Sequence, residues 1–264
     1  MANNMKIGFW GAGEMAEGIL SAIPSKKSVI MAETREERAA ELKKKYGVST
    51  TPSVAEVAKK ADLIFLAVRP AQVADVAEAV KGSIKEGATI VSIAAGKSLA
   101  VLRRAFGPKV ALIRVMPNLA LKANAGMCAI APARGVSKYV LAAVEKILSG
   151  AGRTVILPEK CFDAVTALSG SGPAYFAYMM KMMAEGGEAL GLKKEVARLL
   201  AEQTMYGTAK FLRESEMDLD KFIQGVCTKG GTTAAGMEHL SKPPFGAAVQ
   251  KTLAAAAKRS KELC

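Results

Sequence analysis

The sequence predicts an α/β protein in two parts, a mostly parallel sheet with helices on both faces followed by a wholly helical region. Short apolar runs alternate with amphipathic stretches in the first half of the 264-residue chain, which is typical of parallel strands joined by helices. The strand-like runs end near residue 157, and half of all residues are hydrophobic, enough for a sizeable core. We therefore expect a sheet domain over residues 1–157 and a helical domain over residues 158–264.

Strands are expected where short apolar runs end at a glycine, a proline or a polar turn. Five runs read as strands covered on both faces, because their residues are apolar almost throughout. These five cover residues 6–10, 28–32, 61–68, 89–93 and 110–115, and weaker strands are expected at 127–131 and 154–157. Amphipathic stretches predict helices between them at 35–46, 54–60, 72–81 and 138–148.

The second part is expected to hold helices at 174–184, 193–213, 219–226, 232–240 and 245–263. The first of these is apolar on nearly every side, with three aromatic residues and four methionines between 175 and 183. A helix of this kind is buried all round, either in an ordinary core or against a second subunit. Ser171 is expected to cap its start, with Pro173 in the first turn, where a proline is tolerated.

Several classes of protein are excluded by composition. The longest uncharged run, 164–180, is interrupted by Ser-Gly-Ser-Gly-Pro and is too short to span a membrane. Glu14 and Glu17 come too early for a signal peptide. The four cysteines are far apart in the sequence and His239 is the single histidine, so we expect neither a metal site nor disulfides. A cytoplasmic, reduced protein is the simplest interpretation.

A dinucleotide-binding pattern follows the first predicted strand. Gly11, Gly13 and Ala16 fit the spacing G-x-G-x-x-A between a strand and a helix. The first glycine permits a tight turn, the second allows close approach of a pyrophosphate, and the small third residue lets the helix pack against the strand. The helix N-terminus then offers free N–H groups to the phosphates. This combination is the signature of a Rossmann domain.

The residues after the second predicted strand bear on the choice of cofactor. Glu33 follows Gly13 by 20 residues, where an acidic side chain usually binds the ribose 2′-hydroxyl. Arg35 and Arg38 come next, and an arginine nearby can hold a 2′-phosphate, although a solvated helix face explains them equally well. We expect a nicotinamide cofactor, NAD(P)H, with NADH favoured and NADPH as the alternative.

Longer segments of the chain resemble the pyrroline-5-carboxylate reductase family of proline biosynthesis. The resemblance runs over essentially the whole length. The segments that carry it are Ile7–Ala16, Phe65–Pro70, Ile93–Gly96, Val115–Asn118, Leu168–Tyr175 and Gly230–Thr233. It implies a Rossmann domain joined to a helical dimerisation domain that interlocks with a second subunit, and dimers that assemble into rings of five.

The resemblance also implies the site residues. Thr233 matches the threonine whose hydroxyl faces the ring nitrogen of the substrate, and is the candidate catalytic residue. The expected substrate-binding residues are Thr228, Gly230, Gly231, Thr232, Thr233 and Asn118. The expected cofactor-binding residues are Gly8, Gly11, Ala12, Gly13, Glu14, Met15, Glu33, Thr34, Arg35, Ala67, Val68, Arg69, Pro70, Ala94, Ala95, Gly96, Pro117 and Asn118.

The implied reaction is hydride transfer to the imine carbon of 1-pyrroline-5-carboxylate, which gives L-proline. A glycine-rich helix start at 230–233 suits the substrate carboxylate through its free N–H groups. The matched segments offer no convincing general acid, so the imine is expected to arrive protonated or to take its proton through water. The chain departs from the family at Lys229, where proline is usual, and at Leu119-Ala120, where Thr-Pro is usual.

Two alternative functions remain. A related dehydrogenase acting on another imino or hydroxy acid would use an acid–base lysine on the first long helix of the second part, where Lys181 stands. A nucleotide-sensing or nucleic-acid-binding protein would explain the net charge of +13, but aromatic residues make up only 5% of the chain. The sheet domain holds 23 basic and 12 acidic residues, so nearly all of the excess charge lies in the expected nucleotide-binding part, and we expect neither a nucleic-acid partner nor a membrane partner.

Overall fold

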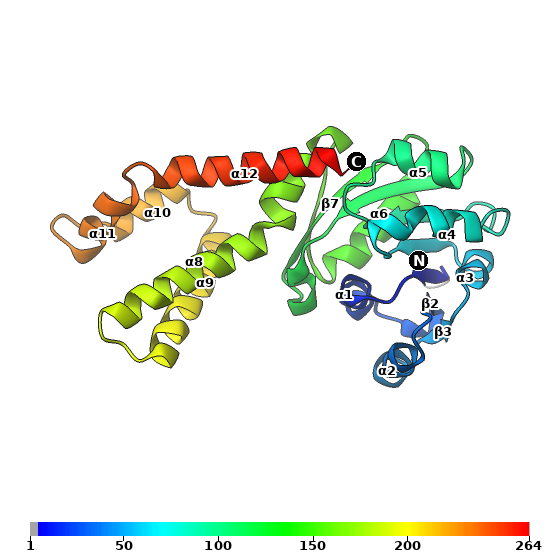
Figure 1. The fold of residues 1–264 in the computed structure, drawn as a ribbon, viewed down its shortest axis with the longest axis horizontal. Coiled ribbons are helices and arrows are strands. Elements are labelled where there is room, and N and C mark those ends of the chain that lie inside the picture. Colours follow the sequence, from blue (N-terminus) through cyan, green and yellow to red (C-terminus); the bar gives the residue numbers. More distant parts are fainter. Residues whose placement is uncertain (1–4, 264) are drawn as a thin grey trace. The chain divides into compact units, whose positions relative to one another are not determined.

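The computed structural model describes residues 5–263 and contains one eight-stranded sheet. The strand order is β3-β2-β1-β4-β5-β6-β7-β8, and every neighbouring pair is parallel except β6 and β7 (Figure 1). The strands are β1 (Ile7–Trp10), β2 (Val29–Ala32), β3 (Ser49–Thr51), β4 (Leu63–Leu66), β5 (Thr89–Ser92), β6 (Ala111–Met116), β7 (Gly126–Pro132) and β8 (Gly152–Ile156). The predicted fold class is confirmed.

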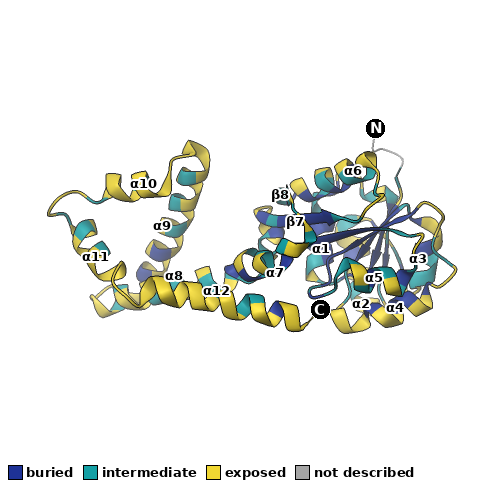
Figure 2. Ribbon diagram, turned by 90° about the horizontal axis from the view of Figure 1, so that it is seen from above, coloured by how far each residue is buried: buried dark blue, intermediate teal, exposed yellow. Residues whose placement is uncertain are grey.

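Helices cover both faces of the sheet, and each face has its own hydrophobic core. The helices are α1 (Glu14–Ala22), α2 (Glu36–Tyr46), α3 (Val54–Lys60), α4 (Val73–Ala79), α5 (Leu99–Phe106), α6 (Lys138–Ser149) and α7 (Phe162–Val165). Phe9 and Phe65, stacked 5.0 Å apart, share one core with α1, α2 and α6. Trp10 and Ile64, on the opposite face, share the other with α3, α4 and α5. The central strands are therefore covered on both faces, and strands inside the sheet carry the buried colour in Figure 2.

Two elements of the sheet domain were not expected from the sequence. Strand β3 is a short polar edge strand, and it forms because β2 offers it a free edge, with Met31 paired to Thr50. Helix α5 begins after Ser98, whose side chain accepts a hydrogen bond from the N–H of Val101. Strand β3 has no apolar run of the kind on which the strand predictions were based, whereas the amphipathic pattern of α5 was present in the sequence.

The second part consists of five helices, in agreement with the sequence. They are α8 (Gly172–Ala189), α9 (Lys194–Ser215), α10 (Leu219–Val226), α11 (Thr232–Leu240) and α12 (Phe245–Glu262). The bounds of α10 and α11 are those that the sequence predicts.

Helix α8 does not lie in an ordinary core of its own chain. Its Phe176 and Tyr178 side chains are 62% and 63% exposed. Among the described residues of Gly172–Ala255, the buried ones are the small residues Gly172, Ala197 and Ala201. Most of these helices carry the exposed colour in Figure 2. Of the two interpretations left open by the sequence, burial against a second subunit is therefore the one that agrees with the structure.

Helix α8 begins directly after Ser171, with Pro173 in its first turn as expected, but Ser171 has helical backbone angles and is not an N-cap. The chain keeps helical backbone angles from α7 through a π-helical segment (Thr166–Gly170) into α8, and the N–H of Ser171 donates to the Thr166 carbonyl at 2.9 Å. Pro173, which has no N–H, leaves the carbonyl four residues earlier, that of Ser169, without a helical donor. The side-chain amide of Asn118 donates to that carbonyl at 3.3 Å.

The chain folds as two compact units. One runs as far as Ser171 and includes the returning chain from Ala256 onward, and the other is Gly172–Ala255. The expected domain boundary at residue 157 falls just after β8. The division of function between residues 1–157 and 158–264 stays a prediction. None of the helices in residues 5–263 is long and apolar enough to cross a membrane.

Glu17 fastens α1 to α2. Its carboxylate, 8% exposed as a residue, accepts hydrogen bonds from Arg38 at 2.5 Å, Lys45 at 2.8 Å and Tyr46 at 2.9 Å. Burial opposes ionisation of Glu17, but these three donors outweigh it and lower the pKa to about 2.

We predict that Glu17→Gln lowers the free energy of unfolding at neutral pH by roughly 1–3 kcal/mol, because charged hydrogen bonds are lost. The wild-type advantage is complete above the ordinary pKa of 4.5 and is lost as the pH falls towards 2, since the folded-state pKa is depressed. Urea denaturation of both proteins at a series of pH values measures this. Glu78→Gln, at an exposed pair with Lys81, is the control. A difference that stays constant down to acidic pH would contradict the assignment.

Candidate active site

A cleft of about 640 Å³ opens where β1, β2 and β4 end. Nine of the residues expected to bind the cofactor line it: Gly11, Ala12, Gly13, Glu33, Thr34, Arg35, Ala67, Val68 and Arg69. Five further residues that were not expected from the sequence also line it: Ala32, Pro52, Val54, Gln72 and Val76. Pro52 and Val54 follow the unexpected strand β3, so no predicted strand end pointed to them.

The turn at Gly11 needs glycine for two reasons. Its φ is +94°, and a Cβ there would lie 2.8 Å from the carbonyl oxygen of Ala67. The Gly11 N–H donates to the Ala32 carbonyl at 3.1 Å, and the Ala67 N–H donates to the Trp10 carbonyl at 2.9 Å. These contacts draw the ends of β1, β2 and β4 together around one turn.

The N-terminus of α1 is open towards a ligand. Gly13 is its N-cap and provides no side-chain cap. No atom lies within 4 Å of the position that a Cβ on Gly13 would take, so the backbone N–H groups of the first turn are accessible to a bulky group. A dinucleotide pyrophosphate fits this space by size and charge.

Three of the expected cofactor residues lie beside the cleft lining. Gly8 lies inside β1, where a Cβ would come within 2.5 Å of the Val57 side chain, so this glycine allows α3 to pack closely. Glu14 pairs with Lys122, and Met15 packs against the core that contains α1.

Glu33 and Arg35 form a pair at the far end of the cleft. The two Glu33 oxygens accept from the Arg35 guanidinium at 3.0 and 2.9 Å. The Arg35 side chain is 66% exposed while that of Glu33 is 7% exposed. Hydrogen bonding from Arg35 lowers the pKa of the Glu33 carboxyl below its ordinary value of 4.5 despite its burial. Glu33 is therefore an anion at neutral pH, held in place at the end of β2.

Arg38, the second arginine considered for a 2′-phosphate, is occupied elsewhere. Its guanidinium donates to the Ala12 carbonyl at 3.1 Å and also to Glu17 and Glu41. It therefore supports the glycine turn from behind, and Arg35 is the exposed one of the two.

The remaining expected residues lie on neighbouring loops. Pro70 begins a 3₁₀ turn (Pro70–Gln72) after β4, and Ala94 to Gly96 form the turn after β5. Pro117 is buried after β6. The Asn118 amide is used within the fold, because its oxygen accepts from the Met127 N–H at 3.1 Å while its nitrogen donates to Ser169.

The expected substrate residues lie in the second unit. Gly230 has a φ of +72°, Gly231 is the N-cap of α11 without a side-chain cap, and Thr233 is exposed in the first turn. Lys229 and His239 are exposed as well. The cleft and the loop expected to bind the substrate thus lie in different units of the chain.

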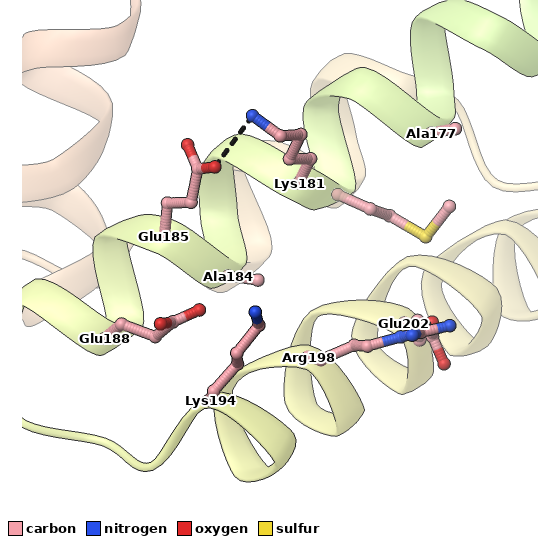
Figure 3. A pocket seen from close by; sticks show the side chains of 9 residues that line it. Ala177, Lys181, Ala184, Glu185, Glu188, Lys194, Arg198 and Glu202 are labelled. Carbon is pink, nitrogen blue, oxygen red and sulfur yellow. Dashed lines mark hydrogen bonds and ion pairs between the residues drawn. The ribbon is translucent and has the colours of Figure 1, made fainter.

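Lys181, the acid–base candidate of the alternative function, is committed to an ion pair. It lies in a pocket of about 410 Å³ between α8 and α9, 2.7 Å from Glu185 (Figure 3). The hydrogen bond to Glu185 raises the pKa of Lys181, so its ammonium is a poor base at neutral pH. Across residues 5–263, no cluster of three or more His, Cys, Asp or Glu could hold a metal ion.

These features together define a nicotinamide-dependent oxidoreductase with a Rossmann domain and a helical region. They are the fold, the glycine turn, the open helix N-terminus and the acidic residue after β2. Residues 6–96 match the family described as NADP oxidoreductase, coenzyme F420-dependent, and residues 159–263 match pyrroline-5-carboxylate reductase dimerisation. A pyrroline-5-carboxylate reductase of Synechocystis is 38% identical, and the alignment covers 98% of both chains. The chain belongs to the pyrroline-5-carboxylate reductase family.

Solved structures agree with this assignment. A Coxiella burnetii pyrroline-5-carboxylate reductase is 31% identical, with a TM-score of 0.94 over 99% of both chains. A Plasmodium falciparum pyrroline carboxylate reductase with NADP bound is 26% identical, with a TM-score of 0.87 over 98% of both chains. The match to the dimerisation family also accounts for the exposed apolar side chains of α8, because the chain is a homo-oligomer.

We predict that Asn118→Ala lowers the free energy of unfolding by roughly 1–3 kcal/mol, because the Ser169 carbonyl and the Met127 N–H both lose their partner. Asn118→Asp keeps the acceptor for the Met127 N–H, so its free energy of unfolding should fall by less. Thermal denaturation measures both variants, with roughly 2–4 °C of Tm for each kcal/mol. A wild-type Tm in Asn118→Ala, with a raised KM for the imine, would show instead that the amide serves the substrate.

Proposed function

We propose that this chain reduces 1-pyrroline-5-carboxylate to L-proline with NAD(P)H, the last step of proline biosynthesis. The observation that carries the proposal is the full-length similarity to pyrroline-5-carboxylate reductases, at 38% identity for the Synechocystis protein. The open cradle at the N-terminus of α1 supports it, because the residues present fit a dinucleotide.

The cofactor site is proposed to run from β2 across the glycine turn towards β5. The backbone N–H groups after Gly13 hold the pyrophosphate, and Glu33 accepts from the adenosine ribose. Ala67, Val68 and the turn at Ala94 to Gly96 border the nicotinamide. The bound cofactor supplies a hydride to the imine carbon, and the chain supplies orientation and exclusion of water.

The substrate is proposed to bind at the start of α11. Its carboxylate accepts from the free N–H groups of the first turn of α11, which no side chain caps, while the Gly231 N–H donates to the Thr228 carbonyl at 2.9 Å. The Thr233 hydroxyl positions the ring nitrogen, which is protonated on arrival or takes its proton from water. The nitrogen keeps that proton as the carbon accepts the hydride, so the product is the uncharged secondary amine and no proton is taken from a protein acid.

A second copy of the chain is proposed to complete each active site. The helices of Gly172–Ala255 expose large apolar side chains, and the loop at 228–233 is exposed on the same unit. An interlocked dimer covers the apolar side chains and brings the loop of one subunit to the cofactor cleft of the other. Five such dimers in a ring are the proposed larger assembly.

NADH is the proposed preferred cofactor. A 2′-phosphate beside Glu33 would meet an anion whose side chain is 7% exposed, and it would have to compete with that anion for Arg35. NADPH is the less favoured donor. We also propose a cytoplasmic location, in keeping with the free thiols of Cys128, Cys161 and Cys227.

The function is tested by following NADH oxidation with 1-pyrroline-5-carboxylate, and then with other cyclic imines and with keto acids. We expect turnover with 1-pyrroline-5-carboxylate and formation of proline. Oxidation of NADH with keto acids alone would favour the dehydrogenase alternative, and no turnover with any of these compounds would favour a binding role.

Thr233→Ala is expected to lower kcat/KM by roughly tenfold to a hundredfold, the effect of one lost hydrogen bond to a charged group. The affinity for NADH should not change, because Thr233 lies outside the cofactor cleft. Thr233→Ser keeps the hydroxyl and is the matched control. Wild-type steady-state kinetics in Thr233→Ala would remove this residue from the mechanism.

Glu33→Ser is expected to raise kcat/KM with NADPH by roughly tenfold, equivalent to about 1.4 kcal/mol, because it removes the anion and releases Arg35 for a phosphate. The same substitution should weaken the binding of NADH. Paired titrations with both cofactors measure the ratio, and Glu37→Ser on the exposed side of α2 is the control. If the ratio of kcat/KM with NADPH to kcat/KM with NADH stays unchanged, Glu33 does not set the cofactor preference.

A further inference from the structure

Glu159 joins the start of the 3₁₀ turn η4 (Glu159–Cys161) to the loop after β5. One of its carboxylate oxygens accepts from the N–H of Leu99, the first residue of α5, at 2.7 Å. The same oxygen accepts from the Arg114 guanidinium at 2.9 Å. The Leu99 N–H is one of the donors that a helix start leaves without an intrahelical acceptor, so Glu159 satisfies it from 60 residues away.

Arg114 makes this contact from inside the sheet. It is 4% exposed on β6, lies opposite Ser92 of β5, and places its guanidinium 4.8 Å from the centre of the buried Phe162 ring. A buried cation that loses its carboxylate partner is strongly destabilising. Glu159 is therefore held at a fixed position by Arg114 and in turn fixes where α5 begins.

The end of the chain contacts the same loop. Gly96, with a φ of +70°, lies so close to Leu263 that a Cβ at 96 would be 2.9 Å from the Leu263 Cβ. The Ser260 hydroxyl donates to Asp163 at 2.7 Å, which fastens this end of α12 beside α7. The Ala94–Ser98 loop is thus contacted at Gly96 by the segment that re-enters this unit at Ala256, and it is followed at once by Leu99, which the segment leaving before Gly172 holds through Glu159.

This loop lies on the catalytic edge of the sheet. Strand β5 is the parallel neighbour of β4, and the carboxyl ends of parallel strands meet at one edge. The cleft begins with the ends of β2, β1 and β4, so the loop after β5 is the next one along, on the side away from Glu33. In the proposed function this is the side of the nicotinamide.

We propose that Glu159 is a positioning residue for hydride transfer. It touches neither reactant, and through the Leu99 N–H and Arg114 it holds the Ala94–Ser98 loop where the nicotinamide meets the imine. This inference rests on the proposed function. It concerns the rate of the chemical step, because small displacements of a positioning loop slow a reaction strongly while binding at distant contacts is preserved.

Glu159→Ala and Glu159→Gln in the full-length oligomer test this. Glutamine keeps an acceptor for Leu99 and loses the charge that Arg114 needs, whereas alanine loses both. The first readout is amide hydrogen exchange of residues 94–102 in the cofactor-free protein. The second is the single-turnover rate constant after NADH-loaded enzyme is mixed with 1-pyrroline-5-carboxylate, which does not depend on the fraction of active protein. NADH affinity is followed by quenching of Trp10, the single tryptophan of the chain.

We expect faster exchange at Leu99 and a single-turnover rate constant about tenfold lower in Glu159→Ala, with NADH affinity close to wild type and a smaller effect in Glu159→Gln. Glu78→Ala, at an exposed ion pair on α4, is the matched control and should change none of these. If Glu159→Ala keeps the wild-type rate constant and only the amplitude of the single turnover falls, fewer molecules are folded and the proposal is overturned. Unchanged hydrogen exchange at Leu99 in this variant overturns it as well. A wild-type enzyme that never oxidises NADH contradicts the proposed function instead, and the exchange readout still decides whether Glu159 holds the loop.

Discussion

The close approach of the Gly11 turn to the end of β4 is the contact on which the cofactor cleft depends. A backbone at φ +94° with the Ala67 carbonyl 2.8 Å from the missing Cβ leaves no room for any other residue. Because β1 lies between β2 and β4, this one turn sets the spacing of three strand ends. The open first turn of α1, the Glu33–Arg35 pair and the loop after β4 all take their positions from it. Arg38 supports the turn from behind through the Ala12 carbonyl.

Three glutamates show that the same type of side chain has different roles at different places in this fold. Glu17 accepts from Arg38, Lys45 and Tyr46 and fastens two helices. Glu33 is held by one exposed arginine at the cleft, where a ligand can compete for that arginine. Glu159 bridges a buried arginine and a helix N-terminus.

The helical region has a different basis of stability from the sheet domain. In the sheet domain three clusters of buried apolar side chains pack against the strands, whereas Gly172–Ala255 buries three small residues among those described. Burial of large apolar side chains is the main favourable contribution to folding, so this region takes its stability from a second subunit. In the proposed dimer the same association completes the active site, and stability and activity would then rise and fall together with protein concentration.

The sequence by itself determined the two-part fold, the cofactor turn and the family, because these depend on local patterns: apolar runs, the spacing of Gly11, Gly13 and Ala16, and short motifs. It did not reveal β3, whose polar residues pair because β2 offers a free edge, nor the occupied state of Arg38. Nor did it reveal that the Asn118 amide donates to the Ser169 carbonyl, 51 residues away, which Pro173 leaves without a helical donor. Only the tertiary structure decided these points, since each depends on contacts between residues that are far apart in the sequence. Hydrogen-bond partners that packing brings together produce no periodic pattern from which they could be predicted.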